Sequence, residues 1–211
     1  YKKVASERGG ENVEYPMKKG TLEGIPYYEY DVDTMIRIYN ETKPKVVVIA
    51  SPNNPTGKRI DSADLKRFLD ASKDTITMID EAYWGFGSTE NEYVKPYIDE
   101  YPNLVICRTF SKFFALAGFR IGFAFAGKNL DTLINFTTRY LGYNRVSEKL
   151  GEIALDNIKW YLKIGKQYEK DKEMMYKEFG KLRGFVPFKS YANFILVDIP
   201  MEVRAGLKKY L

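Results

Sequence analysis

Three segments of this 211-residue chain share one pattern: a short apolar run, rich in β-branched residues, stops abruptly in polar residues. The runs occupy residues 46–50, 75–79 and 103–107, and apolar residues at helical spacing over 61–72 separate the first two. Buried runs that alternate with helices predict parallel strands of a doubly wound α/β sheet. Because the carboxyl ends of such strands share one edge, where ligands bind, we expect these polar residues to lie close together.

Lys112 lies in the stretch that follows the third run, TFSKFFALAGFRIG (109–122). Two hydroxyl residues, Thr109 and Ser111, precede it, and Arg120 follows between two glycines. An amine of this kind forms a Schiff base when its pKa is lowered toward neutrality from about 10.4. Hydroxyls and a guanidinium can hold a phosphate dianion. The stretch therefore predicts a reactive amine beside a phosphate, as in a pyridoxal phosphate (PLP) site.

The other two strand ends supply groups suited to the ring of such a cofactor. Asn54 is held in a turn by Pro55 and can hydrogen-bond a phenolic oxygen. Asp80 directly follows the second run and can pair with a pyridinium nitrogen, which an adjacent carboxylate keeps protonated. Tyr83 could reach the same ring oxygen as Asn54. Asn53 is a weaker candidate, because it can simply shape the turn.

At this point the three segments, SPNNPTG, IDEAYWGF and RTFSKFFALAGFRIG, resemble the signature of fold type I PLP enzymes, the class I/II aminotransferase superfamily. They are most similar to its histidinol-phosphate aminotransferase branch, and the resemblance runs from near Tyr1 to about Pro200. It implies that Lys112 carries the cofactor and later acts as general base. The cofactor-binding residues that it implies are Asn54, Asp80, Tyr83, Thr109, Ser111, Lys112 and Arg120.

The resemblance also implies an activity. The expected reaction is transfer of an amino group between an amino acid or amino-alcohol phosphate, histidinol phosphate being one candidate, and a 2-oxo acid such as 2-oxoglutarate. Two alternatives remain open, because a fold does not fix a function: a decarboxylase or lyase of the threonine-phosphate decarboxylase type, and a non-catalytic regulatory homologue. We further expect a homodimer that acts on small molecules in amino-acid biosynthesis.

Composition excludes several other classes of function. With no histidine and one cysteine, the chain itself can form no disulfide, zinc site or Ser-His-Asp triad. The net charge of +5 comes from interspersed rather than clustered charges, so nucleic-acid binding is not expected. No apolar run approaches the roughly 18 residues of a membrane span. A cytoplasmic location is therefore expected, and Cys107 is interpreted as a small buried hydrophobe.

The expected fold is an aspartate aminotransferase-like large domain with a mostly parallel sheet (residues 1–146, its N-terminal part missing), followed by an interdomain helix and part of a smaller α+β domain (147–211). Strands are expected at 13–17, 121–126 and 190–197, the second antiparallel to its neighbour by resemblance. Ser147 is the expected N-cap of a helix beginning near Glu148, with a kink at Gly165. A packing stripe on that helix is expected at Trp160, Ile164, Tyr168, Met175 and Phe179.

Two pieces that the resemblance requires are not found in this sequence. One is a glycine-rich turn and helix N-terminus that would cradle the cofactor phosphate. The other is a C-terminal arginine that would clamp the substrate carboxylate, since Arg204 lies in the wrong context. We therefore expect this chain to be a fragment, or a chain from which disordered segments have been dropped. We expect the 211 residues alone to bind the cofactor weakly and to turn over poorly.

Overall fold

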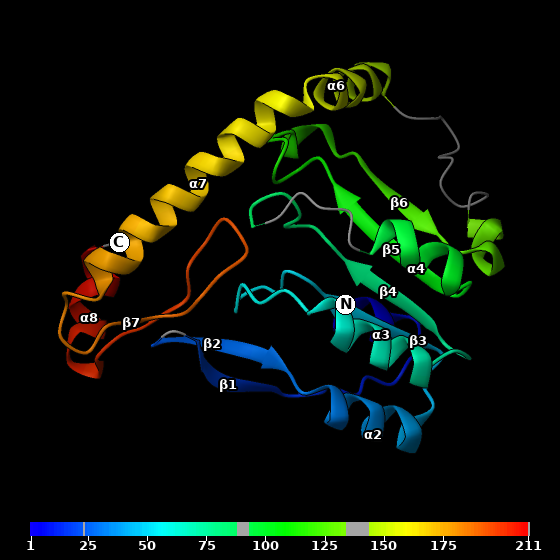
Figure 1. The fold of residues 1–211 in the computed structure, drawn as a ribbon, viewed down its shortest axis with the longest axis horizontal. Coiled ribbons are helices and arrows are strands. Elements are labelled where there is room, and N and C mark those ends of the chain that lie inside the picture. Colours follow the sequence, from blue (N-terminus) through cyan, green and yellow to red (C-terminus); the bar gives the residue numbers. More distant parts are fainter. Residues whose placement is uncertain (23, 88–92, 134–143, 211) are drawn as a thin grey trace.

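The computed structural model describes residues 1–22, 24–87, 93–133 and 144–210, and its centre is a four-stranded sheet (Figure 1). The strands lie in the order β3 (Val46–Ala50), β4 (Ile76–Asp80), β5 (Leu104–Thr109) and β6 (Gly122–Ala126). The first three are parallel, and β6 is antiparallel to β5. The predicted mostly parallel sheet, with its antiparallel fourth strand, is confirmed.

The register of the sheet brings the carboxyl ends of the parallel strands level with one another. Ala50 pairs with Asp80, and Asp80 pairs with Cys107. Just beyond, the Ser51 N–H donates to the Asp80 carbonyl at 2.9 Å and the Glu81 N–H donates to the Cys107 carbonyl at 2.9 Å. The polar segments that follow β3, β4 and β5 therefore begin at one edge of the sheet, as predicted.

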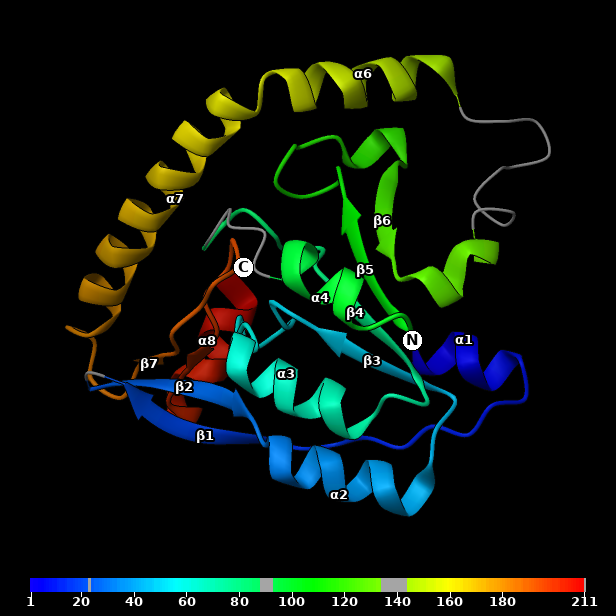
Figure 2. The ribbon, with the colours of Figure 1, turned by 45° about the vertical axis from the view of Figure 1, so that its right-hand side comes forward.

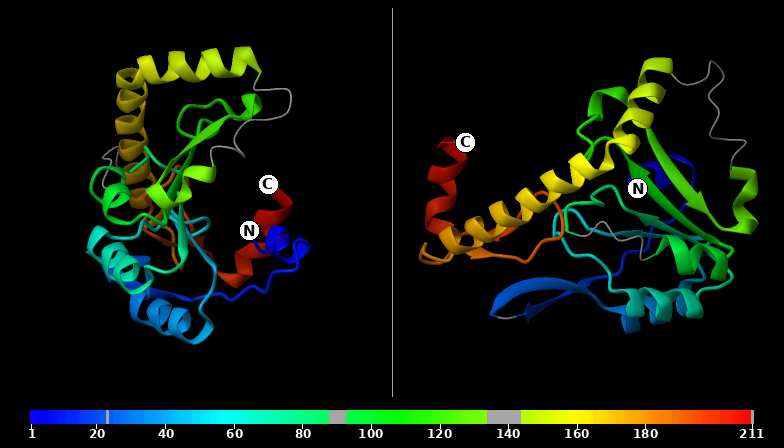
Figure 3. Two further views of the ribbon diagram at one scale, coloured as in Figure 1. Left: turned by 90° about the vertical axis from the view of Figure 1, so that its right-hand side faces the viewer. Right: turned by 45° about the horizontal axis from the view of Figure 1, so that its top comes forward.

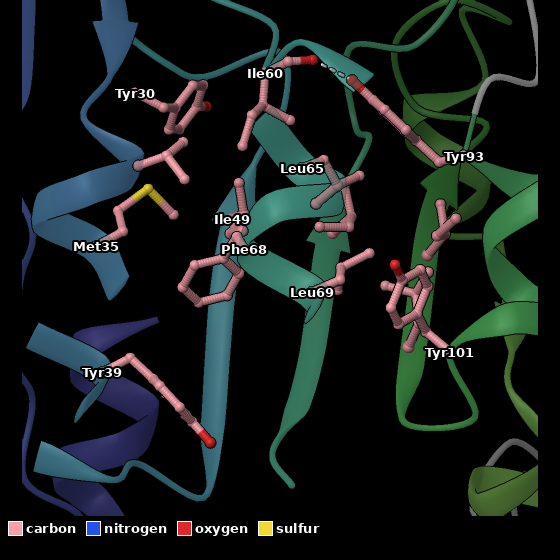
Figure 4. Close-up of a cluster of buried hydrophobic side chains, with 14 residues drawn as sticks. Tyr30, Met35, Tyr39, Ile49, Ile60, Leu65, Phe68, Leu69, Tyr93 and Tyr101 are labelled. Carbon is pink, nitrogen blue, oxygen red and sulfur yellow. Dashed lines mark hydrogen bonds between the residues drawn. The ribbon is translucent and has the colours of Figure 1, made fainter. Parts of the chain in front are cut away.

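Three helices, α2 (Val32–Thr42), α3 (Ser62–Ala71) and α4 (Val94–Glu100), flank this sheet (Figure 2). Asp31 is the N-cap of α2, and its carboxylate accepts a hydrogen bond from the Thr34 N–H at 3.2 Å. Buried side chains of α2 and α3 form the main core with strand residues (Figure 4). Burial of Ile49, Leu65 and Phe68, each at most 1% exposed, fixes α3 against the sheet.

Two consecutive helices, α6 (Arg145–Asp156) and α7 (Ile158–Phe179), form an arch outside the carboxyl ends of the parallel strands (Figures 1 and 3). The predicted N-cap is wrong, because the side chain of Asn144 caps α6 by accepting from the Val146 and Ser147 N–H groups. The predicted kink is also misplaced: the helix breaks at Asn157 and continues through Gly165. A Cβ at Gly165 would lie only 3.2 Å from the Gly85 carbonyl oxygen, so glycine here permits close packing.

The predicted packing stripe on this helix is only partly correct. Trp160 is 58% exposed and Met175 is also exposed, whereas Ile164 and Phe179 are half-buried and the Tyr168 ring packs edge-on against the Phe86 ring. The buried residues of α7 are Gly165, Lys172 and Tyr176. Hydropathy spacing missed this face because a glycine and a lysine contribute to it.

The remaining elements are small. They are α1 (Lys2–Glu7), the hairpin of β1 (Met17–Leu22) and β2 (Ile25–Tyr30), the 3₁₀ helices η1 (Ala117–Phe119) and η2 (Lys128–Leu133), the pair β7 (Val186–Pro187) and β8 (Val197–Asp198), and α8 (Met201–Tyr210). The strand predicted at 13–17 is wrong, since β1 begins only at Met17. The strand predicted at 190–197 is also wrong, because most of it is a loop that contacts the turn after β3.

No helix among the residues that the structure describes is long and apolar enough to cross a membrane. The predicted division into domains at residues 146 and 147 stays a prediction.

Candidate active site

The turn after β3 and the segment after β4 meet through one hydrogen bond. The Asn54 amide donates to the Tyr83 hydroxyl at 2.9 Å, so these two predicted ring-binding residues do lie together. The turn is closed by the Gly57 N–H, which donates to the Asn53 carbonyl at 2.7 Å, and by the Thr56 hydroxyl, which donates to Asn53 Oδ1 at 2.9 Å. Asn53 thus shapes the turn that presents Asn54, the role considered for it from the sequence.

Asp80 ends β4 at the same edge and is partly buried. Its Oδ1 accepts a hydrogen bond from the Ala82 N–H at 2.9 Å. Burial raises the pKa of the Asp80 carboxyl despite this bond. Burial also raises the pKa of the neighbouring Cys107 thiol, with a smaller contribution from the charge of Asp80. A carboxylate in this setting is costly to ionise, and a cation placed beside it would offset that cost.

Lys112 is exposed, and its position follows from the aromatic residues beside it. Phe113 and Phe114 are almost fully buried in a second hydrophobic cluster, which anchors the loop after β5. The Ala115 N–H donates to the Lys112 carbonyl at 3.0 Å and tightens this loop. The Lys112 amine consequently lies 5.5 Å from the centre of the Tyr83 ring. The structure therefore brings the predicted reactive amine to the Asn54–Tyr83 pair.

The predicted phosphate-binding residues are brought together only in part. The Thr109 hydroxyl donates to the Ser111 hydroxyl at 2.9 Å and accepts from the Ser111 N–H at 3.0 Å. Arg120 is exposed, and its guanidinium donates to the Ala117 carbonyl at 2.9 Å within its own loop. The two segments are linked through Ile121, whose carbonyl accepts from the Phe110 N–H at 3.2 Å. Thr109 and Ser111 form one hydroxyl pair, while Arg120 lies at the neighbouring turn.

Sequence reasoning missed a buried ion pair behind this edge. Arg108 Nε lies 2.7 Å from Glu81 Oε2, and both side chains are 5% exposed. The Arg108 guanidinium lies 4.2 Å from the centre of the Trp84 ring. Alternation along a strand puts Glu81 and Arg108 on the face opposite to Asp80 and Thr109. The available signal was an acid and a base at matching positions of neighbouring strand ends.

A second missed contact comes from the C-terminal part of the chain. The Phe194 ring meets the Tyr83 ring edge-on, with centroids 5.0 Å apart and an interplanar angle of 87°. No local motif marks Phe194 as a site residue. The sequence hinted at this contact only through Gly57 after the Asn-Asn-Pro turn, because a glycine allows another backbone to approach closely.

One cavity lies elsewhere and does not belong to this constellation. It has a volume of about 180 Å³ and is lined by residues at the amino ends of β4 and β5, among them Thr75, Thr77 and Leu104. Within the described ranges, no group of three or more His, Cys, Asp or Glu side chains could hold a metal ion.

An α/β sheet with an amine, an amide and a phenol brought together at one edge, and a carboxyl group at the same edge, is the arrangement of α/β enzymes that hold an aromatic aldehyde cofactor. The family model described as "Aminotransferase class I and II" matches residues 1–209. The chain belongs to this family, whose members use PLP, and the family predicted from the sequence motifs is confirmed.

Individual relatives agree with this membership. The chain is 33% identical over 200 residues to a histidinol-phosphate aminotransferase of Ruminiclostridium cellulolyticum, covering 94% of this chain and 53% of the relative. The crystal structure of histidinol-phosphate aminotransferase from Sinorhizobium meliloti with pyridoxal-5'-phosphate superposes with a TM-score of 0.75 at 22% identity, covering 92% of this chain and 51% of that one. A decarboxylase from Sulfurospirillum multivorans gives a TM-score of 0.71 at 25% identity, covering 85% and 53%. The chain spans about half the length of the curated relatives it matches.

Proposed function

We propose that this chain forms the greater part of the cofactor-binding site of a PLP-dependent aminotransferase. The reaction proposed is transfer of an amino group between an amino acid or amino-alcohol phosphate and a 2-oxo acid. Histidinol phosphate is the specific candidate for the amino donor, since the relative from R. cellulolyticum bears the name histidinol-phosphate aminotransferase. For the amino acceptor we propose 2-oxoglutarate. One observation carries the proposal: the Lys112 amine lies 5.5 Å from the centre of the Tyr83 ring, whose hydroxyl accepts a hydrogen bond from the Asn54 amide.

The residues present fit PLP chemically. PLP supplies an aldehyde that condenses with amines and a ring that withdraws electrons from the carbon next to the bound nitrogen. Asn54 and Tyr83 would hold the ring hydroxyl, Asp80 the ring nitrogen, and Lys112 the aldehyde carbon. The phosphate would be held by Thr109, Ser111 and Arg120.

The raised pKa of Asp80 supports its assigned role. Burial disfavours the ionised carboxylate, so this side chain gains most when a positively charged group lies against it. A protonated ring nitrogen is such a group. The fit is therefore electrostatic as well as geometric: this chain already bears the desolvation cost that a cationic ring would offset.

Lys112 has the second chemical role. A primary amine that is first bonded to the cofactor and later displaced by a substrate amine can move a proton at the substrate's α-carbon through Nζ. Tyr83 and Asn54 would keep the ring in register with this amine. Positioning of this kind is worth several kcal/mol of a barrier, because reacting groups must lie within about 3–3.5 Å of one another.

A decarboxylase is the second candidate, and it is favoured by the structural similarity to the S. multivorans decarboxylase. The two reactions need the same amine, carboxyl and phenol, so the ring-binding residues do not separate them. The products do: a 2-oxo acid indicates amino transfer, and carbon dioxide indicates decarboxylation. We also propose that the whole protein is a cytoplasmic homodimer acting on small molecules rather than on nucleic acid.

The decisive experiment maps the attachment of PLP. The complete polypeptide is incubated with PLP, reduced with borohydride to make the amine linkage permanent, digested, and analysed by mass spectrometry. We expect the added mass on the peptide that contains Lys112 and no addition there in Lys112→Ala. Lys128→Ala, which removes another exposed lysine, serves as the control. The wrong amine has been assigned if the adduct lies on a different lysine. The same follows if the Schiff-base absorbance band of the protein persists in Lys112→Ala. A screen of amino donors then identifies the substrate.

A further inference from the structure

The latch loop, defined here as residues 190–194, contacts two of the segments that build the candidate site. The Tyr191 N–H donates to the Gly57 carbonyl at 2.7 Å, in the turn that carries Asn54. Three residues later, the Phe194 ring lies edge-on against the Tyr83 ring. The loop therefore touches both sides of the Asn54–Tyr83 hydrogen bond, although it belongs to the last part of the chain. Figure 1 shows this part of the chain between α7 and the sheet.

Two buried side chains of α7 hold the start of the latch loop. The Lys172 amine donates to the Ser190 carbonyl at 3.0 Å, and the Tyr176 hydroxyl accepts from the Ser190 N–H at 2.9 Å. The Lys172 side chain is only 6% exposed and also lies 2.8 Å from Glu169 Oε1. Burial lowers the pKa of Lys172, which means that the charged amine is costly at this place. A buried charge of this kind needs its hydrogen bonds, so it fixes the backbone it binds more strictly than apolar packing would.

The latch loop is seated on glycine backbone, which leaves no room for a side chain. Gly57 has φ +71°, and a Cβ there would lie 2.6 Å from Ser190 Cβ and 2.9 Å from Ser190 Cα. A Cβ at Gly87, in the segment after Tyr83, would lie 2.9 Å from Tyr191 Cβ. The backbones of the loop and of these two segments therefore lie close together, so a displacement of the loop would move both segments, since packed atoms cannot yield by much.

We propose that the latch loop is a positioning element of the active site. Lys172 and Tyr176 fix Ser190 on the turn of Asn54, and Phe194 holds the Tyr83 ring so that its hydroxyl meets the Asn54 amide. The inference rests on the proposed function, in which Asn54 and Tyr83 touch the cofactor. Phe194 is a positioning residue, because it acts through Tyr83. The same contacts tie α7 to the site.

The test compares variants of the complete polypeptide by hydrogen exchange, first without PLP. Tyr176→Phe removes one hydroxyl, and Lys172→Met removes the charge while it keeps an unbranched apolar stem. Lys170→Met, at an exposed position of the same helix, is the matched control. In Tyr176→Phe and Lys172→Met we expect faster amide exchange over residues 53–57, where the Gly57 N–H donates to the Asn53 carbonyl. In the control variant the exchange rate over these residues should stay at the wild-type value. Unchanged exchange over 53–57 in both variants would overturn the inference.

The second readout is the dissociation constant for PLP, measured on folded protein. Loss of a neutral hydrogen bond in Tyr176→Phe, or of the ring pair in Phe194→Leu, should weaken PLP binding roughly two- to tenfold. Phe194→Tyr keeps the ring and should restore wild-type affinity. Equal affinity in all variants would refute a positioning role, even if their thermal stability differs. If the wild type takes up no PLP, the proposed function fails, while hydrogen exchange still decides whether the loop fixes the turn.

Discussion

Substitution of Gly57 by alanine tests how tightly the chain is closed around the site. Two costs arise in Gly57→Ala. Its φ of +71° places a residue with a Cβ in the left-handed region, at roughly 1–2 kcal/mol. The new Cβ would also lie 2.6 Å from Ser190 Cβ, well inside contact distance. Overpacking of this kind costs about 1–3 kcal/mol, so the expected loss of unfolding free energy is about 2–5 kcal/mol.

A matched glycine separates the two costs. Gly9 has φ +75°, and a Cβ there would have no atom within 4 Å. Gly9→Ala should therefore show only the backbone cost, about 1–2 kcal/mol. The difference between the two variants measures the steric contact with Ser190. Adding Ser190→Gly to Gly57→Ala removes most of that contact, so the double variant should lose less than the sum of the single ones.

Unfolding in urea, monitored by circular dichroism on the protein without PLP, gives these free energies from midpoints and slopes. The reasoning fails if Gly57→Ala is no less stable than Gly9→Ala. It also fails if the two substitutions at 57 and 190 are additive, because then the close approach between these backbones would carry no energy. PLP affinity should fall in Gly57→Ala, since Asn54 lies in the same turn. It should stay unchanged in Gly9→Ala.

Two further predictions concern buried charge. Glu81→Gln removes the carboxylate that pairs with buried Arg108 and should cost about 3–5 kcal/mol of unfolding free energy. Glu178→Gln removes the carboxylate of an exposed ion pair and should change the unfolding free energy little. Equal losses in the two variants would contradict the burial argument. Burial raises the folded-state pKa of Asp80 above its unfolded value of about 3.9, so its contribution to stability falls as pH rises from that unfolded value through the folded one. Asp80→Asn should therefore be more stable than the wild type at neutral pH without PLP, equal to it well below the unfolded pKa, and weaker in binding PLP. Urea unfolding across pH checks the sign, and a less stable variant at neutral pH would contradict it.

The sheet and most of the candidate site could be predicted because their information is local. Each of the three apolar runs became a strand, since a buried strand needs only a few consecutive apolar residues to be recognised. The rule that parallel strands end at one edge then brought Asn54, Tyr83 and Lys112 together without any knowledge of the fold's details. The N-cap of α6 shows the limit of such reasoning. Asn144 and Ser147 are both good caps, so residue preference alone does not choose between them.

The latch loop could not be predicted, because nothing local specifies it. Residues 190–197 contain an apolar, β-branched segment that is typical of a strand, yet Ser190 is fixed by two bonds from α7 and Tyr191 by a bond to Gly57. Tertiary contacts therefore override strand propensity here. Hydropathy patterns also fail to predict the buried face of α7. That face includes Lys172, a residue type that such patterns place on the surface.

The motif residues could be predicted and the latch loop could not, and both outcomes have one physical cause. The groups that would touch the cofactor lie within a few residues of strand ends, so they are encoded in short motifs that a sequence reveals. The groups that set the separation between those motifs, Lys172, Tyr176 and Phe194, belong to elements far away in the chain. Chemistry at the site depends on distances correct to a fraction of an ångström. A chain that kept all three motifs but lost the latch would therefore retain the cofactor-binding residue types without the Asn54–Tyr83 geometry that makes them useful.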